Sequence, residues 1–84
     1  MRITIESTSK IVELIVDGYP VPARVWQGET ESGVPVHCFI TRIAPEIPKS
    51  GPRIDELTAE FERELRRRAD PRPTVEAIPL RLII

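Results

Sequence analysis

Residues 11–43 read IVELIVDGYPVPARVWQGETESGVPVHCFITRI, and this stretch decides the fold. Two turn signals divide it, first Asp17-Gly18 and then the segment from Gly28 to Gly33. Asp-Gly is favoured in two-residue hairpin turns because both central residues take positive φ there. The pattern therefore predicts a three-stranded antiparallel meander. Its expected strands are Ile11–Val16, Tyr19–Gly28 and Val34–Ile43.

The two turns also predict a register. A two-residue loop at Asp17-Gly18 places Leu14 opposite Val21, and a four-residue loop over 29–32 places Val25 opposite Val36. Residues directly opposite one another share a face of the sheet. One face then carries only apolar residues and a tyrosine, and it is the predicted core. Its members are Val12, Leu14, Val16, Tyr19, Val21, Ala23, Val25, Val36, Cys38 and Ile40.

Outside the meander, the sequence predicts a fourth short strand over Ile3–Glu6, a proline-rich linker over 44–51 and one helix over about 52–69. Apolar residues recur at helical spacing in the last of these, and we expect their stripe to cover the core face. The stripe comprises Ile54, Leu57, Phe61 and Leu65. The apolar tail, residues 75–84, suits an edge strand that docks either on its own subunit or on a neighbour. The expectation is one α+β domain over 1–84, with a four- or five-stranded mainly antiparallel sheet and the helix packed on one face.

Composition narrows the classes of partner. A chain of 84 residues has a marginal core, and one cysteine with one histidine provides neither a disulfide nor a common zinc site. Oligomerisation is the remaining way to stabilise so small a core, so we expect a homo-oligomer.

The net charge of −1 argues against a nucleic acid polymer as a partner. No apolar run reaches the ~20 residues of a membrane span. The N-terminus has no secretory h-region, and the single Cys38 suits a reducing, cytoplasmic compartment.

The second face of the predicted sheet is apolar and aromatic, and a single helix cannot cover it as well as the first. Its members are Ile11, Glu13, Ile15, Pro22, Arg24, Trp26, Pro35, His37, Phe39 and Thr41. The predicted register sets Arg24 opposite His37. Uncovered patches of this kind mark interfaces or ligand grooves. Two interpretations stay open: a contact with another subunit or the tail, or a ligand platform. In the platform, Trp26 and Phe39 stack on a planar group while Arg24 and His37 bind an anion.

The residues give no sign of catalysis. His37 and Cys38 alternate along a strand and point to opposite faces, so a Cys–His nucleophilic pair is not expected. The glycines belong to turns, since no phosphate-loop spacing occurs. We therefore expect no catalytic residues, no metal site and no cofactor, and a protein that is not an enzyme.

Three stretches, Ala23–Gly28, Pro35–Ile43 and Ala77–Leu82, resemble short accessory proteins encoded by tailed phages and prophages. The resemblance implies action in a host bacterial cytoplasm, and it carries no functional residues with it. Small phage proteins of this kind include oligomeric sponges that sequester nucleotide immune signals. The leading expectation is therefore a non-enzymatic anti-defence protein that binds a small anionic, nucleotide-like ligand. The alternative is a protein–protein inhibitor or adaptor that acts on a host or phage protein.

Overall fold

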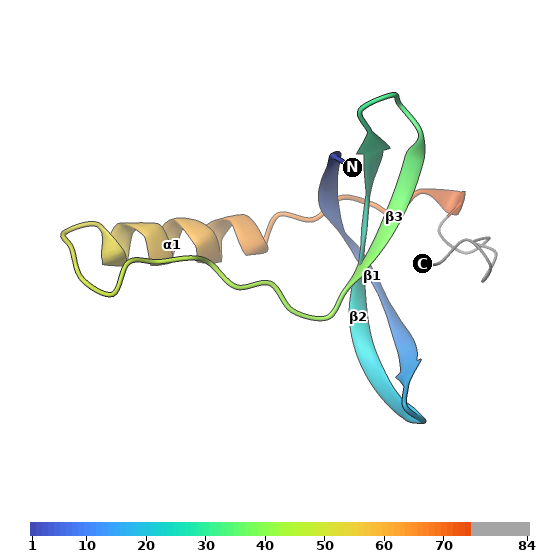
Figure 1. The fold of residues 1–84 in the computed structure, drawn as a ribbon, viewed down its shortest axis with the longest axis horizontal. Helices are drawn as coiled ribbons and strands as arrows, with labels where there is room; N and C mark the ends of the chain where they lie inside the picture. Colours follow the sequence, from blue (N-terminus) through green and yellow to red (C-terminus); the bar gives the residue numbers. More distant parts are fainter. Residues whose placement is uncertain (75–84) are drawn as a thin grey trace.

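The computed structural model describes residues 1–74 and shows a small α+β fold (Figure 1). Three strands form one antiparallel sheet in the order β1-β2-β3, and a single helix follows them. The strands are β1 (Ile3–Val16), β2 (Tyr19–Thr30) and β3 (Pro35–Ile40), and the helix is α1 (Ile54–Leu65). The predicted meander is therefore confirmed. The predicted tail strand over 75–84 lies outside the described residues.

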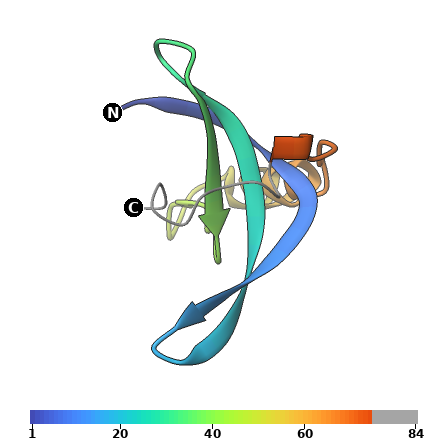
Figure 2. The same ribbon diagram turned by 90° about the vertical axis from the view of Figure 1, so that its right-hand side faces the viewer.

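The first hairpin has the predicted register. Asp17 and Gly18 both take positive φ, 51° and 83°, as a two-residue turn of this hand requires. Leu14 pairs with Val21 and Val12 pairs with Ala23. Figure 2 shows β1 and β2 bending together toward this turn, beyond the end of β3.

The separate fourth strand predicted over Ile3–Glu6 is wrong, because the chain does not turn at Ser7-Thr8-Ser9. Instead β1 runs on through a bulge between Ser7 and Ile11. Thr8 is fully buried in the bulge. Its Oγ1 donates to the carbonyl oxygen of Val25 at 2.6 Å and accepts from the N–H of Lys10 at 3.2 Å. These bonds satisfy polar groups that a bulge leaves unpaired, so the extra residues stay in the strand.

The register predicted for the second hairpin is wrong by three residues. Trp26 lies opposite Cys38, and Gly28 lies opposite Val36. The prediction treated Gly28 as part of the turn, but it lies inside β2, where a Cβ would sit 1.8 Å from the carbonyl oxygen of Thr4. The turn begins two residues later than predicted, after Thr30, and Gly33, with φ of 89°, donates to the carbonyl oxygen of Thr30 at 3.0 Å. An odd slip exchanges the two faces of β3.

The sheet therefore has two faces of unexpected composition. We call one the Trp26 face; from its pairs and strand alternation it carries Ser7, Ile11, Arg24, Trp26, Val36, Cys38 and Ile40. We call the other the Val25 face; it carries Glu6, Val12, Leu14, Ala23, Val25, Gln27, His37 and Phe39. Ala23, Val25 and Gln27 are the buried side chains of β2. The small core of the described chain therefore belongs to the Val25 face.

Two prolines explain why β3 stops at Ile40. Pro20 and Pro22 pair with Ile15 and Glu13 of β1, in positions where their missing N–H would face away from β1. The strand beyond Arg24 thus offers no N–H to β3, and pairing ends at Arg24–Ile40. Past this point β1 and β2 form a two-stranded ribbon, the distal ribbon, over residues 11–23.

The helix is shorter than predicted and contacts the other face of the sheet. α1 covers Ile54–Leu65, and none of its residues is buried. Its Phe61 and Leu65 line a pocket with Trp26, whereas the sequence placed the apolar stripe over Val12, Leu14 and Val16. The Val25 face is instead occupied by the segment after the helix, whose backbone binds Gln27. In Figure 1 only the C-terminal end of α1 comes near the sheet.

Residues 66–74, which we call the strap, lead from the Trp26 face to the Val25 face. Ala69 crosses the edge of β1: its N–H donates to the Ser7 carbonyl oxygen at 2.8 Å, and its carbonyl oxygen accepts from the Ser9 N–H at 3.1 Å. Gln27 then holds the strap by both ends of its amide. Its Nε2 donates to the Asp70 carbonyl oxygen at 3.1 Å, and its Oε1 accepts from the Arg72 N–H at 2.9 Å. The strap thereby lies over Gln27.

Candidate functional site

The structure separates the four predicted site residues into two pairs. Arg24 and Trp26 share the Trp26 face, while His37 and Phe39 lie on the Val25 face. The partner predicted for Arg24, His37, instead lies opposite Gln27. The four-residue platform is therefore not assembled, because the slip of three residues in the second hairpin turns β3 over.

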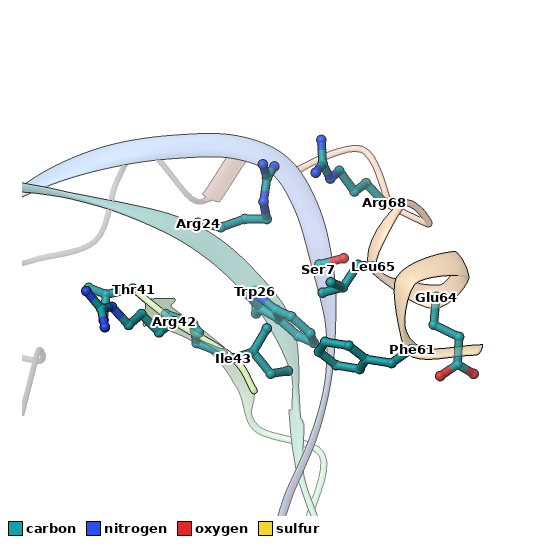
Figure 3. A pocket seen from close by; sticks show the side chains of 11 residues that line it. Ser7, Arg24, Trp26, Thr41, Arg42, Ile43, Phe61, Glu64, Leu65 and Arg68 are labelled. Carbon is teal, nitrogen blue, oxygen red and sulfur yellow. The ribbon is translucent and has the colours of Figure 1, made fainter. Parts of the chain in front are cut away.

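Arg24 and Trp26 instead line a pocket of about 320 Å³ between the sheet and the C-terminal half of α1 (Figure 3). This volume lies at the lower end of the range of small-molecule sites. Its walls come from β1, β2, the end of β3 and the chain after it, and the helix with the first residues of the strap. The lining residues are Ser7, Arg24, Trp26, Ile40, Thr41, Arg42, Ile43, Phe61, Glu64, Leu65 and Arg68.

The apolar part of the pocket consists of side chains from three segments. Figure 3 shows the ring of Phe61 reaching from α1 to the indole of Trp26, with Ile43 beside them. Trp26 and Phe61 are both half-buried. Their rings present apolar area on which a planar group can stack.

The charged part of the pocket is cationic. Three arginines line it, Arg24, Arg42 and Arg68, against one carboxylate, Glu64. The guanidinium groups of Arg24 and Arg68 point to the same side in Figure 3, and the Glu64 carboxylate points away from Trp26. Guanidinium groups bind phosphates and carboxylates through paired N–H donors. The arrangement therefore suits an anion at the rim and an apolar group against Trp26.

Arg24 is the best-positioned of the three arginines. Its Nη1 donates to the carbonyl oxygen of Thr8 at 2.9 Å, and its side chain is half-buried. The bulge that exposes this carbonyl is itself held by the buried Thr8 hydroxyl. A guanidinium has five N–H donors, so the bond to Thr8 fixes its direction and leaves donors for a ligand.

His37 belongs to a different environment, beneath the strap. Its Nε2 is buried without a hydrogen-bond partner, and the Nε of Arg72 is in the same condition. Burial and, secondarily, the charge of Arg72 lower the pKa of His37 below 6.5. Lowering the pKa favours the neutral ring, so His37 is poorly suited to bind an anion. Phe39 lies opposite Val25 and packs on the core side of the sheet.

Sequence reasoning missed Phe61, Arg42 and Arg68 as pocket residues. Phe61 was visible as part of the helical stripe, and only the direction of that stripe was misjudged. Arg68 lies beyond the helix, which ends at Leu65, so its place in the pocket depends on the course of the strap. No signal in the sequence placed Arg42, because its position depends on where β3 stops.

The part of the chain from 1 to 74 contains no cluster of three or more His, Cys, Asp or Glu residues that could hold a metal ion. Within the same range, no helix is both long enough and apolar enough to cross a membrane. No protein-family model matches the sequence, and neither a curated protein nor a solved structure matches it significantly.

Proposed function

We propose that the protein is a non-enzymatic binding protein whose ligand is a small anion with a planar ring, such as a nucleotide. The observation that supports this best is the presence of Arg24 and Trp26 in one pocket, with Arg68 and Phe61 brought to them by the helix and strap. The ring stacks against Trp26 and Phe61, and the phosphate lies at Arg24 and Arg68. Glu64 is the one carboxylate among the pocket residues, and it leaves the pocket without an acid–base pair.

The resemblance to phage accessory proteins supports a biological setting for this proposal. In that setting the ligand is a host nucleotide signal, and the protein sequesters it in the bacterial cytoplasm without altering it. A protein that sequesters a signal needs only to bind it tightly and to be abundant. A small pocket in each of several copies is sufficient for that binding.

Isothermal titration calorimetry with a panel of mono-, di- and cyclic nucleotides tests the proposal. Arg24→Ala removes a charge-assisted hydrogen bond worth about 1.5–3 kcal/mol, so affinity should fall roughly ten- to a hundredfold. Arg53→Ala is the matched control, because Arg53 is an exposed arginine outside the pocket, paired with Glu56. His37→Asn should leave binding unchanged, since His37 lies on the opposite face. Absence of binding by the parent protein, or equal losses in Arg24→Ala and Arg53→Ala, contradicts the proposal.

A second candidate function, an adaptor or inhibitor of another protein, is favoured by the distal ribbon. Val16 and Tyr19 pair there on one face and are 48% and 74% exposed. Exposed apolar side chains in a cluster are typical of protein-binding surfaces. The two candidates separate cleanly: Tyr19→Ser abolishes binding to a protein partner and leaves the pocket intact, whereas Arg24→Ala does the reverse.

A further inference from the structure

The outer edge of β1 has backbone groups available for pairing in the distal ribbon. Glu13 and Ile15 lie opposite Pro22 and Pro20, in the non-hydrogen-bonded pairs of the hairpin. In such pairs the N–H and C=O groups of both residues point away from the neighbouring strand. Among the described strands β1 is at the edge of the sheet, so none of them meets these groups. Figure 2 shows the ribbon projecting beyond the end of β3.

This edge lacks the protection that the opposite edge of the ribbon has. Pro20 and Pro22 remove the N–H groups from the outer edge of β2. Over residues 11–16 the β1 edge has no proline and a single charge, Glu13, between Ile11 and Ile15, which are 55% and 68% exposed. Natural proteins seldom leave an apolar edge strand open, since it templates pairing with another strand.

We propose that this edge pairs antiparallel with the same edge of a second copy of the chain, across a two-fold axis at Leu14. Glu13 then lies opposite Ile15 of the second copy, and Val12 lies opposite Val16. Because both contacts repeat on the other side of the axis, one short segment supplies both halves of the interface. None of these residues lines the pocket described above, so the contact does not depend on the proposed ligand.

Backbone alternation and charge restrict the register of this pairing. The outward groups belong to alternate residues, so the two-fold axis must pass through a residue and not between two. An axis at Glu13 sets the Glu13 carboxylates of the two copies directly opposite each other, which is destabilising. An axis at Leu14 instead sets each Glu13 opposite the apolar Ile15.

The strap restricts the register further. Ala69 bonds to Ser7 and Ser9, which closes the edge of β1 to a second copy at these positions. An axis nearer to the strap than Leu14 would carry the Asp17 turn of the second copy onto them. An axis at Leu14 brings that turn to the first position after the bulge, and an axis farther from the strap would only shorten the paired stretch. Charge and space therefore select the same register.

Pairing also gives the ribbon the packing that it lacks. Val12 and Leu14 are half-buried and Val16 is 48% exposed, and the three alternate along β1 on one face. The pairing sets these residues of the two copies side by side, so each copy covers apolar surface of the other. A two-stranded ribbon is marginally stable alone, whereas three or more strands with an apolar face form a stable sheet. The open edge and the apolar face thus fit the same partner, a second copy.

A single cysteine tests the position of the axis in the full-length chain. Leu14→Cys, in a Cys38→Ser background, should oxidise to a disulfide-linked dimer, because a residue on the axis lies about 4.5 Å from its own copy between Cα atoms. The matched control, Val12→Cys in the same background, should stay a single chain, since its two copies lie about 13 Å apart along the sheet. Non-reducing electrophoresis and mass spectrometry measure both. A linked dimer of the control, or none of Leu14→Cys, overturns the proposal.

Charge at Ile15 gives a second readout that needs no covalent bond. In the proposed register, Ile15→Glu meets Glu13 of the second copy twice, whereas Ile15→Lys gains two opposite charges. The dissociation constant from analytical ultracentrifugation should be about tenfold higher for Ile15→Glu than for Ile15→Lys. Adding Glu13→Gln to each variant should remove the difference. Equal dissociation constants for the two single variants, or a parent protein that sediments as a single chain, contradicts the pairing.

Discussion

At the level of single residues, Gln27 is the side chain that holds the strap against the sheet. It is 6% exposed, and it uses both ends of its amide on the strap, with the Glu6 carboxylate as a further neighbour of its Nε2 at 3.5 Å. Buried polar groups are tolerated when they are hydrogen-bonded. Arg72 adds to the same connection, because its Nη2 donates to the Gly28 carbonyl oxygen at 3.1 Å. One strand residue thus fixes a segment more than forty positions away.

Replacing Gln27 by Leu keeps the volume and removes the hydrogen bonds. The Asp70 carbonyl and the Arg72 N–H would lose their partners, and each unsatisfied group costs about 1–3 kcal/mol. We expect the free energy of unfolding to fall by about 2 kcal/mol or more in urea titrations. Thr4→Val, an exposed change on the same strand pair, should stay within about 0.5 kcal/mol. A Gln27→Leu variant as stable as the parent would show that the strap is held by other contacts.

His37 should give the stability of the protein a pH dependence. Its folded pKa is lowered, so below 6.5, its value in the unfolded chain, the unfolded state binds more protons than the folded state. Stability should therefore be constant above neutrality and decline as the pH falls through 6.5. Urea titrations from pH 8 to pH 5 measure this. His37→Gln, which has no titrating group, should show a shallower decline, and an identical slope in both proteins would rule out His37 as the cause.

At the scale of elements, Gly28 decides how close β1 and β2 approach. A Cβ there would lie 1.8 Å from the Thr4 carbonyl oxygen and 2.7 Å from the Ile5 Cα, both of them backbone atoms. Gly28→Ala must push the two strands apart, and forced overpacking costs roughly 1–3 kcal/mol. We expect a lower melting temperature for Gly28→Ala and almost none of this effect for Glu29→Ala, its exposed neighbour. Equal melting temperatures would mean that the strands separate there without cost.

The same glycine marks the limit of prediction from sequence. Asp17-Gly18 specified the first hairpin because the residue types fit one turn type with one loop length. Gly28 and Gly33 offered two places to begin the second turn, and glycine serves equally for a turn or for close backbone approach. Choosing the turn moved β3 by three residues and carried His37 and Phe39 to the wrong face. Arg24 and Trp26 kept their common face because both lie on β2, whose alternation does not depend on the second turn.

The helix shows a different limit. Its apolar stripe was found correctly, but a stripe does not name the surface it covers. That choice depends on the strap, whose contacts with Ser7 and Gln27 join residues about sixty and forty-five positions apart. Polar contacts of such range leave no periodic signal in the sequence.

At the scale of the whole molecule, the chain is extended for its size. Its radius of gyration is 15.3 Å, against about 12 Å for a compact domain of 84 residues. Its accessible surface is 7182 Å², against about 5,000 Å² for a folded monomer of 9.5 kDa. Among the described residues, α1 contains no buried residue, and Ile15, Val16 and Tyr19 of the distal ribbon are exposed. Surface of this kind is normally covered in the functional state.

We therefore expect self-association through the faces of the distal ribbon. Val16 and Tyr19 at its tip are 48% and 74% exposed, and a two-stranded ribbon is marginally stable in water without further packing. Fully burying each large apolar side chain contributes roughly 1.5–3 kcal/mol, so a few such residues from each copy support micromolar association. Light scattering at micromolar concentration should give at least twice the chain mass of 9.5 kDa. Val16→Ser with Tyr19→Ser should reduce it to one chain mass, while Glu31→Ser, in the other turn, should not. A parent protein that scatters as a single chain would instead show that the ribbon is stable alone, with its apolar tip open to a different protein.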